Sequence, residues 1–413
     1  MLILIFDSGK FDSSINWSTG VTLMTCCSHL FRKIKSSSAT GFAGTDIDVS
    51  ELHNVKIYTY KELRIATTGF SLANKIGQGG FGSVYKGKLR DGCLVAIKVL
   101  SAESKQGVHE FLTEIKVISS IEHENLVKLY GCCVEDNHRI LVYGYLENNS
   151  LAQTLLGHSN IKFSWDVRRN ICVGVARGLA FLHGEVRPHI IHRDIKASNV
   201  LLDTDLRPKI SDFGLAKLIS PNLTHISTRV AGTAGYVAPE YAIRNQVTRK
   251  SDIYSFGVLL LEIVSGRPNT NRRLPVKEQY LLTRAWDLYE KGELKTLVDS
   301  FLEEDFSVEE ALKFCKIGLL CTQDSPQLRP SMSTVLKMLM GEKDVNEDNI
   351  IKPGIIFEFV DAIDQEDKKC KAEVKSTSTS LLASSGKQDD SSSSETVTSF
   401  ATMSFTAICD RTN

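Results

Sequence analysis

The stretch Ile191–Leu202, IHRDIKASNVLL, decides how this chain of 413 residues is interpreted. Asp194 can accept a proton from an attacking hydroxyl group, and Asn199 offers a side-chain oxygen that suits a hard cation. The segment Lys209–Gly214, KISDFG, follows, and its Asp212 is a second acid that suits Mg²⁺. Two acids and an amide that converge on metal ions indicate phosphoryl transfer, in which a protein mainly positions groups and neutralises charge.

Upstream of these acids lies a candidate cradle for a nucleotide. Ile76–Val84 reads IGQGGFGSV, and Lys98 follows on an apolar stretch, VAIK, that predicts a β-strand. Glycines there let backbone N–H groups approach phosphate oxygens closely. A lone G-x-G-x-x-G is also found in dinucleotide-binding folds. Here Phe81 and Val84 fit a β-hairpin, and a strand lysine stands in place of a ribose-binding acid.

The ordered set of glycine loop, strand lysine, HRD, DFG and the APE of Ala238–Glu240 resembles the eukaryotic protein kinases. The resemblance covers residues 70 to about 341. It implies an α+β bilobal fold, with a small antiparallel β lobe that carries the αC helix and a large lobe that is mainly α-helical. Taken singly, each motif has an ordinary structural explanation; taken together and in this order, such explanations lose most of their weight.

The resemblance also assigns roles. Lys98 would contact the ATP phosphates and pair with Glu114, 16 residues later, with Glu110 as the rival one turn earlier. Asp212 and Asn199 would hold Mg²⁺, or Mn²⁺ as an alternative; Asp194 would be the base, and Lys196 would neutralise charge during transfer. Tyr143 would be the gatekeeper, and the backbone of Gly144 and Leu146 would contact adenine. The residues expected at the nucleotide are Ile76, Gly77, Gln78, Gly79, Gly80, Phe81, Gly82, Ser83, Val84, Ala96, Lys98, Tyr143, Gly144 and Leu146.

Local phrases narrow the family. Asp194 and Lys196 form the D-x-K spacing of serine/threonine kinases, and Thr233 supports that choice. The phrases YTYKELRIATTGF, GVARGLAFLH and ISTRVAGTAGYVAPEYA resemble plant receptor-like kinases, the relatives of Pelle and the interleukin-receptor-associated kinases. The expected protein is a receptor-like cytoplasmic serine/threonine kinase that modifies proteins, itself included, downstream of a membrane receptor kinase. The alternatives are a nucleotide-binding scaffold whose catalysis is dispensable and a fragment of a larger receptor.

Composition sets few limits. Charged residues make up 24% of the chain and the formal net charge is zero, so nothing indicates a nucleic-acid partner. The ten cysteines form no C-x-x-C pair, which predicts reduced thiols. The sequence leaves the oligomeric state unknown.

The first residues allow two interpretations. No apolar run approaches the length of a membrane span, so a cytoplasmic protein is expected. Met24 resembles a natural start more closely than Met1 does. Cys26 and Cys27, before the basic cluster of residues 32–35, fit a palmitoylated anchor at the inner face of the plasma membrane. An unstructured basic leader with incidental cysteines explains the same residues equally well.

The chain is expected to divide into a flexible leader at 1–56, a short helix within 57–69, a kinase domain at 70–342 and an extension at 343–413. The helix prediction rests on Thr59 and Glu62, which match a capping box, and on Gly69 as a stop. The extension is Ser-rich from about 371 and is expected to be disordered there.

Regulation is expected in the activation segment. Arg193 precedes the catalytic Asp, and kinases with that arginine commonly need a phosphate on this segment to pair with it. Ser227 and Thr228 are the preferred positions, and Thr233 fits the substrate platform better. The candidates between the DFG and APE motifs are Ser220, Thr224, Ser227, Thr228 and Thr233.

Two further residues are expected to be structural. Glu240 should pair with Arg329, which would anchor the activation segment to the late helices. Asp252 should cap a hydrophobic helix and hydrogen-bond the backbone of the HRD turn.

Overall fold

The computed structural model describes residues 55–79, 82–100, 105–157, 161–275, 278–302, 306–353 and 404–405. The chain divides into two units. The first is Met1–Ile47 with Glu135–Asn137, of which only the last three residues are described. Apart from Glu135, every element below belongs to the second unit, Asp48–Val134 and His138–Asn413.

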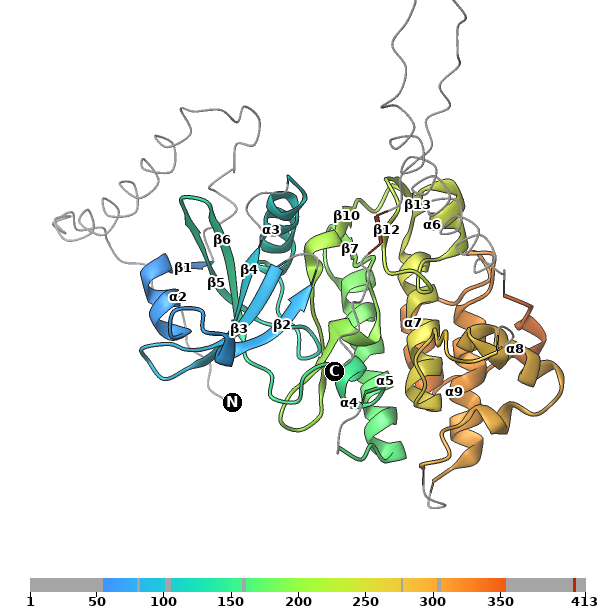
Figure 1. The fold of residues 1–413 in the computed structure, drawn as a ribbon. Helices are drawn as coiled ribbons and strands as arrows, with labels where there is room; N and C mark the ends of the chain where they lie inside the picture. Colours follow the sequence, from blue (N-terminus) through green and yellow to red (C-terminus); the bar gives the residue numbers. More distant parts are fainter. Residues whose placement is uncertain are drawn as a thin grey trace, which may run out of the picture. The chain divides into compact units, whose positions relative to one another are not determined.

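The first part of the described chain forms a six-stranded sheet in the order β1-β5-β6-β4-β3-β2 (Figure 1). Strands β2, β3, β4 and β6 pair antiparallel, as expected. Strand β1 is the exception, because it pairs with β5 in parallel. The bounds are β1 Lys56–Ile57, β2 Lys75–Gly79, β3 Gly82–Lys88, β4 Leu94–Leu100, β5 Leu129–Glu135 and β6 His138–Gly144.

Each face of the sheet has its own core, because side chains alternate along a strand. On β4, Val95 and Ile97 pack with Leu63 of α2 (Tyr60–Ala66) in a small cluster. Ala96 packs against the other, larger core. Lys98 follows the same alternation, so it faces away from α2. The expected helix is therefore present, and its Thr59–Glu62 capping box is complete.

Helix α3 (Lys105–Ile118) follows β4 and packs on the sheet. Its buried Phe111, Ile115 and Ile118 recur at the three- and four-residue spacing of an amphipathic helix. Glu110 and Glu114 are also buried on α3.

The remainder is mainly helical, as predicted. Helix α7 is buried along nearly its whole length, Ser251–Ser265, and α5, α8 and α9 pack against it (Figure 1). The π-helical turn is Phe181–Glu185. The helices are α4 Leu151–Thr154, α5 Trp165–Ala180, α6 Pro239–Arg244, α7 Arg249–Ser265, α8 Leu281–Glu290, α9 Val308–Cys321 and α10 Met332–Leu339.

Short strands and 3₁₀ turns between these helices carry the motifs. Strand β7 pairs with β10, β8 with β9, β11 with β13 and β12 with β14. Their bounds are β7 His189–Ile191, β8 Val200–Leu202, β9 Pro208–Ile210, β10 Lys217–Ile219, β11 Ile226–Ser227, β12 Ala231–Gly232, β13 Gln246–Val247 and β14 Ser404–Phe405. The 3₁₀ turns are η2 Leu72–Asn74, η4 Ala197–Asn199, η5 Phe213–Leu215, η7 Leu294–Leu297 and η8 Glu347–Asn349.

Several predictions lie outside the described residues. They concern Met24, Cys26 and Cys27 in the leader, Gly80 and Phe81 in the glycine loop, and the Ser-rich tail from 371.

Candidate active site

The glycine loop joins β2 to β3, which pair antiparallel. Gly82 has φ +137°, and a Cβ built there would lie 2.0 Å from the carbonyl oxygen of Val99. Only glycine fits this conformation and this approach. Among the described residues, no atom lies within 4 Å of a Cβ built at Gly79.

Lys98 connects the sheet, α3 and the DFG segment. Its Nζ lies 2.9 Å from Glu114 Oε2 and 2.8 Å from Asp212 Oδ1. Glu114 is thus the acid that pairs with Lys98, the pairing preferred over Glu110 in the sequence.

The surrounding charges keep Lys98 and Asp212 ionised. Burial would lower the pKa of Lys98, but the carboxylates of Asp212 and Glu114 raise it well above its ordinary value. Burial would likewise raise the pKa of Asp212, and the charge of Lys98 lowers it instead. In phosphoryl transfer, a lysine ammonium group neutralises charge on the phosphates and a carboxylate binds the divalent cation.

Asp212 has a left-handed backbone conformation, with φ 67°. It stands directly before η5, whose Phe213 is fully buried and meets the ring of His192 edge-on at 4.8 Å between centroids. Ser211 donates its N–H to the carbonyl oxygen of Asn199 at 2.8 Å. These contacts hold the DFG acid beside the segment that carries Asn199.

Asp194 is only 3% exposed and has hydrogen-bond donors on both carboxylate oxygens. Thr233 Oγ1 donates to its Oδ1 at 2.7 Å, and Asn199 Nδ2 donates to its Oδ2 at 2.9 Å. Lys196 Nζ lies 2.8 Å from Asp194 Oδ2 and 2.6 Å from Thr233 Oγ1. The structure therefore brings together Asp194, Lys196, Asn199 and Thr233.

The backbone of the HRD turn is held from beneath by Asp252. Its two carboxylate oxygens accept the N–H groups of His192 and Arg193, both at 2.8 Å. This confirms the predicted hydrogen bonds to the turn. The predicted capping role is wrong, because α7 begins at Arg249 and Thr248 caps it.

Two buried acids tie the activation segment to helices. Arg329 forms two hydrogen bonds with Glu240, at 2.9 and 2.8 Å, which confirms the predicted pair. Glu262, on α7, accepts the hydroxyl of Tyr236 at 2.7 Å. This second contact could not be predicted, because Glu262 stands within an apolar helical run.

At the hinge, Tyr143 is buried on β6 and Gly144 donates its N–H to Lys128 O at 3.1 Å. That N–H is therefore engaged within the protein, and an adenine contact at Gly144 has to use another atom. Burial raises the pKa of the Tyr143 hydroxyl well above its ordinary value, so this phenol stays neutral.

The residues present suit ATP with a divalent cation. Asn199 uses its amide nitrogen on Asp194, so its amide oxygen is the atom it can offer a cation. Among the described residues, no cluster of three or more His, Cys, Asp or Glu side chains would hold a metal by itself. A cation held by one carboxylate, one amide and substrate phosphates is the arrangement that Mg²⁺ favours.

Comparison with known proteins agrees with this geometry. The protein kinase domain family matches residues 70–339, which is well over half of the chain. The chain belongs to the protein kinase family. It therefore uses ATP as substrate with a divalent metal ion, and its other substrates are proteins.

The relatives specify the type of kinase. The chain is 69% identical over 320 residues to cold-responsive protein kinase 1 of Arabidopsis thaliana, which covers 76% of this chain and 82% of that protein. It is 55% identical over 302 residues to a probable LRR receptor-like serine/threonine-protein kinase of the same plant, covering 73% of this chain and 29% of that one. The predicted relation to plant receptor-like serine/threonine kinases is confirmed, and the kinase fold with it. The chain spans less than a third of the receptor-like relative.

Proposed function

We propose that Lys98, Glu114, Asp212 and Asn199 hold ATP and Mg²⁺, or Mn²⁺, for transfer of the γ-phosphate to serine and threonine hydroxyls. The observation that carries the proposal is the ion-pair connection of Lys98 to both Glu114 and Asp212. It supports a site that is already arranged for catalysis. When bound, the cation would neutralise charge on the phosphates, and the protein residues position the reacting groups.

Asp194 is proposed as the base that orients the acceptor hydroxyl and takes its proton. Thr233 Oγ1 donates to Asp194 Oδ1. This contact supports the proposal, because it is a hydrogen bond from a hydroxyl group to this carboxylate. Lys196 Nζ contacts the same two residues, which would place its positive charge beside the acceptor hydroxyl and the transferred phosphate. Thr233 is 6% exposed, and we assign it to the substrate platform.

We further propose that phosphorylation of the activation segment regulates the enzyme through Arg193. This guanidinium group contacts the carbonyl oxygens of Leu215 and Arg229. Burial lowers the pKa of His109, and the nearby charges of Lys217 and Arg193 lower it further. Basic groups therefore gather at this place. A phosphate on exposed Ser227, on neighbouring Thr228 or on Thr224 would bring negative charge to these basic groups.

We propose a cellular location and an upstream partner from the similarity to plant receptor-like kinases. We infer a cytoplasmic kinase that acts downstream of a membrane receptor kinase, with attachment to the inner face of the plasma membrane through Cys26 and Cys27. Among the residues that the structure describes, no helix has the length and apolar character needed to cross a bilayer. Hydroxylamine-sensitive acyl labelling tests the attachment: the label should disappear from a Cys26→Ser, Cys27→Ser variant.

The chemistry is tested with purified full chain and labelled ATP. We expect label on serine and threonine of the protein and of a basic protein substrate, with none after chelation of divalent cations. Restoration by Mg²⁺ or by Mn²⁺ would identify the ion. Label on tyrosine, or transfer that persists without a divalent cation, would contradict the proposal. In the plant, rescue of function by Asp194→Asn would favour the scaffold alternative.

A further inference from the structure

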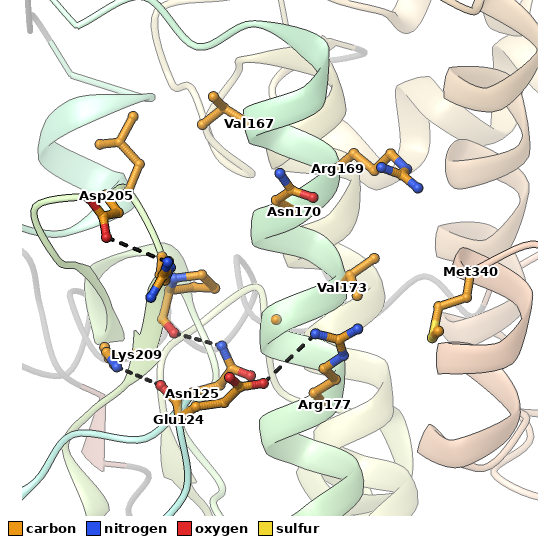
Figure 2. A pocket seen from close by; sticks show the side chains of 14 residues that line it. Glu124, Asn125, Val167, Arg169, Asn170, Val173, Arg177, Asp205, Lys209 and Met340 are labelled. Carbon is orange, nitrogen blue, oxygen red and sulfur yellow. Dashed lines mark hydrogen bonds and ion pairs between the residues drawn. The ribbon is translucent and has the colours of Figure 1, made fainter.

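A cavity of about 490 Å³ opens on the helical part, away from the catalytic residues. Its walls are α5, the loop at Glu124 and Asn125, the turn between β8 and β9, and Met340 just beyond α10. We call it the α5 groove. Figure 2 shows Arg169, Val173 and Arg177 along α5, with Met340 across from them. Neither Lys98, Asp194 nor Asp212 lines it.

The floor of the α5 groove is apolar and firmly packed. Gly174 and Pro208 are both buried there. A Cβ at Gly174 would lie 2.5 Å from Pro208 Cγ, so the β8–β9 turn sits directly against the helix backbone. Val173 and Met340 extend the apolar surface, and Met340 is 42% exposed. A flexible, exposed methionine adapts to an apolar side chain placed against it.

The rim carries basic side chains, two of which, Arg169 and Lys209, lie within 4 Å of acids outside the lining, Glu310 and Asp203. Four basic side chains but only two acids, Glu124 and Asp205, line the groove; the basic ones are Arg169, Arg177, Arg207 and Lys209. Arg177 is 45% exposed and lies 3.8 Å from Glu124, and Arg207 is 71% exposed and lies 3.6 Å from Asp205. Exposed ion pairs of this length contribute little to stability. Arg177 and Arg207 can therefore exchange these partners for other carboxylates. The groove thus suits an acidic segment that carries an apolar residue.

The chain itself holds a segment of this chemistry. Asp361–Asp367 reads DAIDQED, four acids and one isoleucine, with no basic residue before Lys368. It lies outside the described residues and begins eight positions after Pro353, the last residue described before it.

The segment is long enough to reach the groove. Glu310, near the start of α9, pairs with Arg169 at 3.0 Å, and Gln323, just past its end, accepts the N–H of Ile351. Glu310 and Gln323 are thirteen residues apart, and the helical rise separates them by about 20 Å. With one side-chain contact added at each end, Ile351 lies about 25–30 Å from Arg169. An extended chain covers that in about nine residues, so positions from about 360 onward reach the groove.

We propose that Asp361–Asp367 docks in the α5 groove of its own chain. Ile363 contacts the apolar surface of Val173 and Met340, and the flanking carboxylates pair with Arg177 and Arg207. Because the segment is tethered, docking is intramolecular and needs only modest affinity.

The test is photo-crosslinking of the full chain with p-benzoylphenylalanine in place of Ala362. We expect a crosslink within the monomer to peptides of α5 or of the β8–β9 turn. The same probe in place of Ala383 is the matched control and should not reach these peptides. Crosslinking should weaken as salt is raised, because the rim contacts are exposed.

Variants separate a specific contact from proximity. Arg177→Gln with Arg207→Gln should lower the crosslink yield at least fivefold, whereas Arg244→Gln, which is exposed and outside the groove, should leave it unchanged. Unaltered autophosphorylation and melting temperature would show that the variants fold. A crosslink to any other surface, an equal yield from the arginine variants, or a crosslink only between two copies would overturn the proposal.

Discussion

Tyr236 donates its hydroxyl to Glu262, 2.7 Å from Oε1 and 2.8 Å from Oε2, and so joins the segment that follows Thr233 to the central helix α7. The same carboxylate accepts the N–H of Asn269 at 2.7 Å. The Asn269 amide donates to Gly235 O, and Ser255 Oγ donates to Tyr236 O. The segment from Gly235 to Tyr236 is therefore held by polar contacts with α7 and Asn269.

A Glu262→Gln variant should lose part of the pH dependence of stability. Burial raises the pKa of Glu262 to about 7, above its unfolded value of 4.5. Its contribution to stability is complete below pH 4.5 and is lost as pH rises through about 7, on the order of 3 kcal/mol in total. Melting temperatures between pH 5 and 8.5 should fall less steeply in the variant, and exposed Glu290→Gln should follow the wild type. Parallel curves for Glu262→Gln and wild type would contradict the assignment.

Tyr236→Phe should weaken binding of protein substrate and leave ATP binding intact. It removes the hydroxyl that joins the platform to Glu262 without changing the shape of the ring. We expect KM for a peptide substrate to rise severalfold, with KM for ATP unchanged. Tyr289→Phe, on α8, is the control. An equal change in both KM values would show a general loss of structure.

Lys98→Met should abolish most activity and also destabilise the protein. The change leaves the carboxylates of Glu114 and Asp212 without their cation. Loss of a fixed charge at the phosphates lowers kcat/KM by at least about a hundredfold. A second change, Glu114→Gln, should recover part of the melting temperature and none of the activity. Recovered activity would remove Lys98 from the proposed chemistry.

Arg329→Met should be among the most destabilising single changes in the helical part. Arg329 is buried, and besides Glu240 it donates to the carbonyl oxygens of Gln323, Lys250 and Asp324. Removing one partner of a buried ion pair costs about 3–5 kcal/mol. Arg329→Lys should recover little, because an ammonium group cannot form the two parallel hydrogen bonds. Chemical denaturation followed by fluorescence measures both, and a loss below about 1 kcal/mol for Arg329→Met would be inconsistent with this role.

Replacing Ser227 and Thr228 by alanine should reproduce the effect of phosphatase on the wild type. Among the described residues, the Arg193 guanidinium group donates to the carbonyl oxygens of Leu215 and Arg229 and to the Tyr241 hydroxyl, none of which carries a charge. Activity should fall in both cases, and phosphatase should have no further effect on the variant. If phosphatase lowers the activity of that variant further, another site such as Thr224 carries the regulation.

The residues of the candidate active site could be predicted because they stand in short motifs with fixed spacing. Lys98 and Glu114 are 16 positions apart, and a strand followed by an amphipathic helix brings them together. The helix at Tyr60–Ala66 was equally readable, since its cap is local.

Other features depend on tertiary packing and left no local pattern. The two-residue strand β1 carries no periodicity, and its parallel pairing with β5 depends on Gly131, where a Cβ would lie 2.1 Å from Lys56 O. In the sequence, Glu262 is one polar residue within an apolar helix. Its role is evident only from the tertiary structure, which places Tyr236 beside it. The cap predicted at Asp252 is wrong because α7 begins earlier, at Arg249, where the side chain of Thr248 provides the cap.

We expect Asp194 to act in transfer of the γ-phosphate while other residues hold the nucleotide. The most direct measurement is the rate of γ-phosphate transfer by wild type and Asp194→Asn, with ATP affinity measured on the same samples. We expect the variant to bind ATP with unchanged affinity and to transfer phosphate at least about a hundredfold more slowly. A near-wild-type rate of transfer by Asp194→Asn would contradict the role proposed for Asp194.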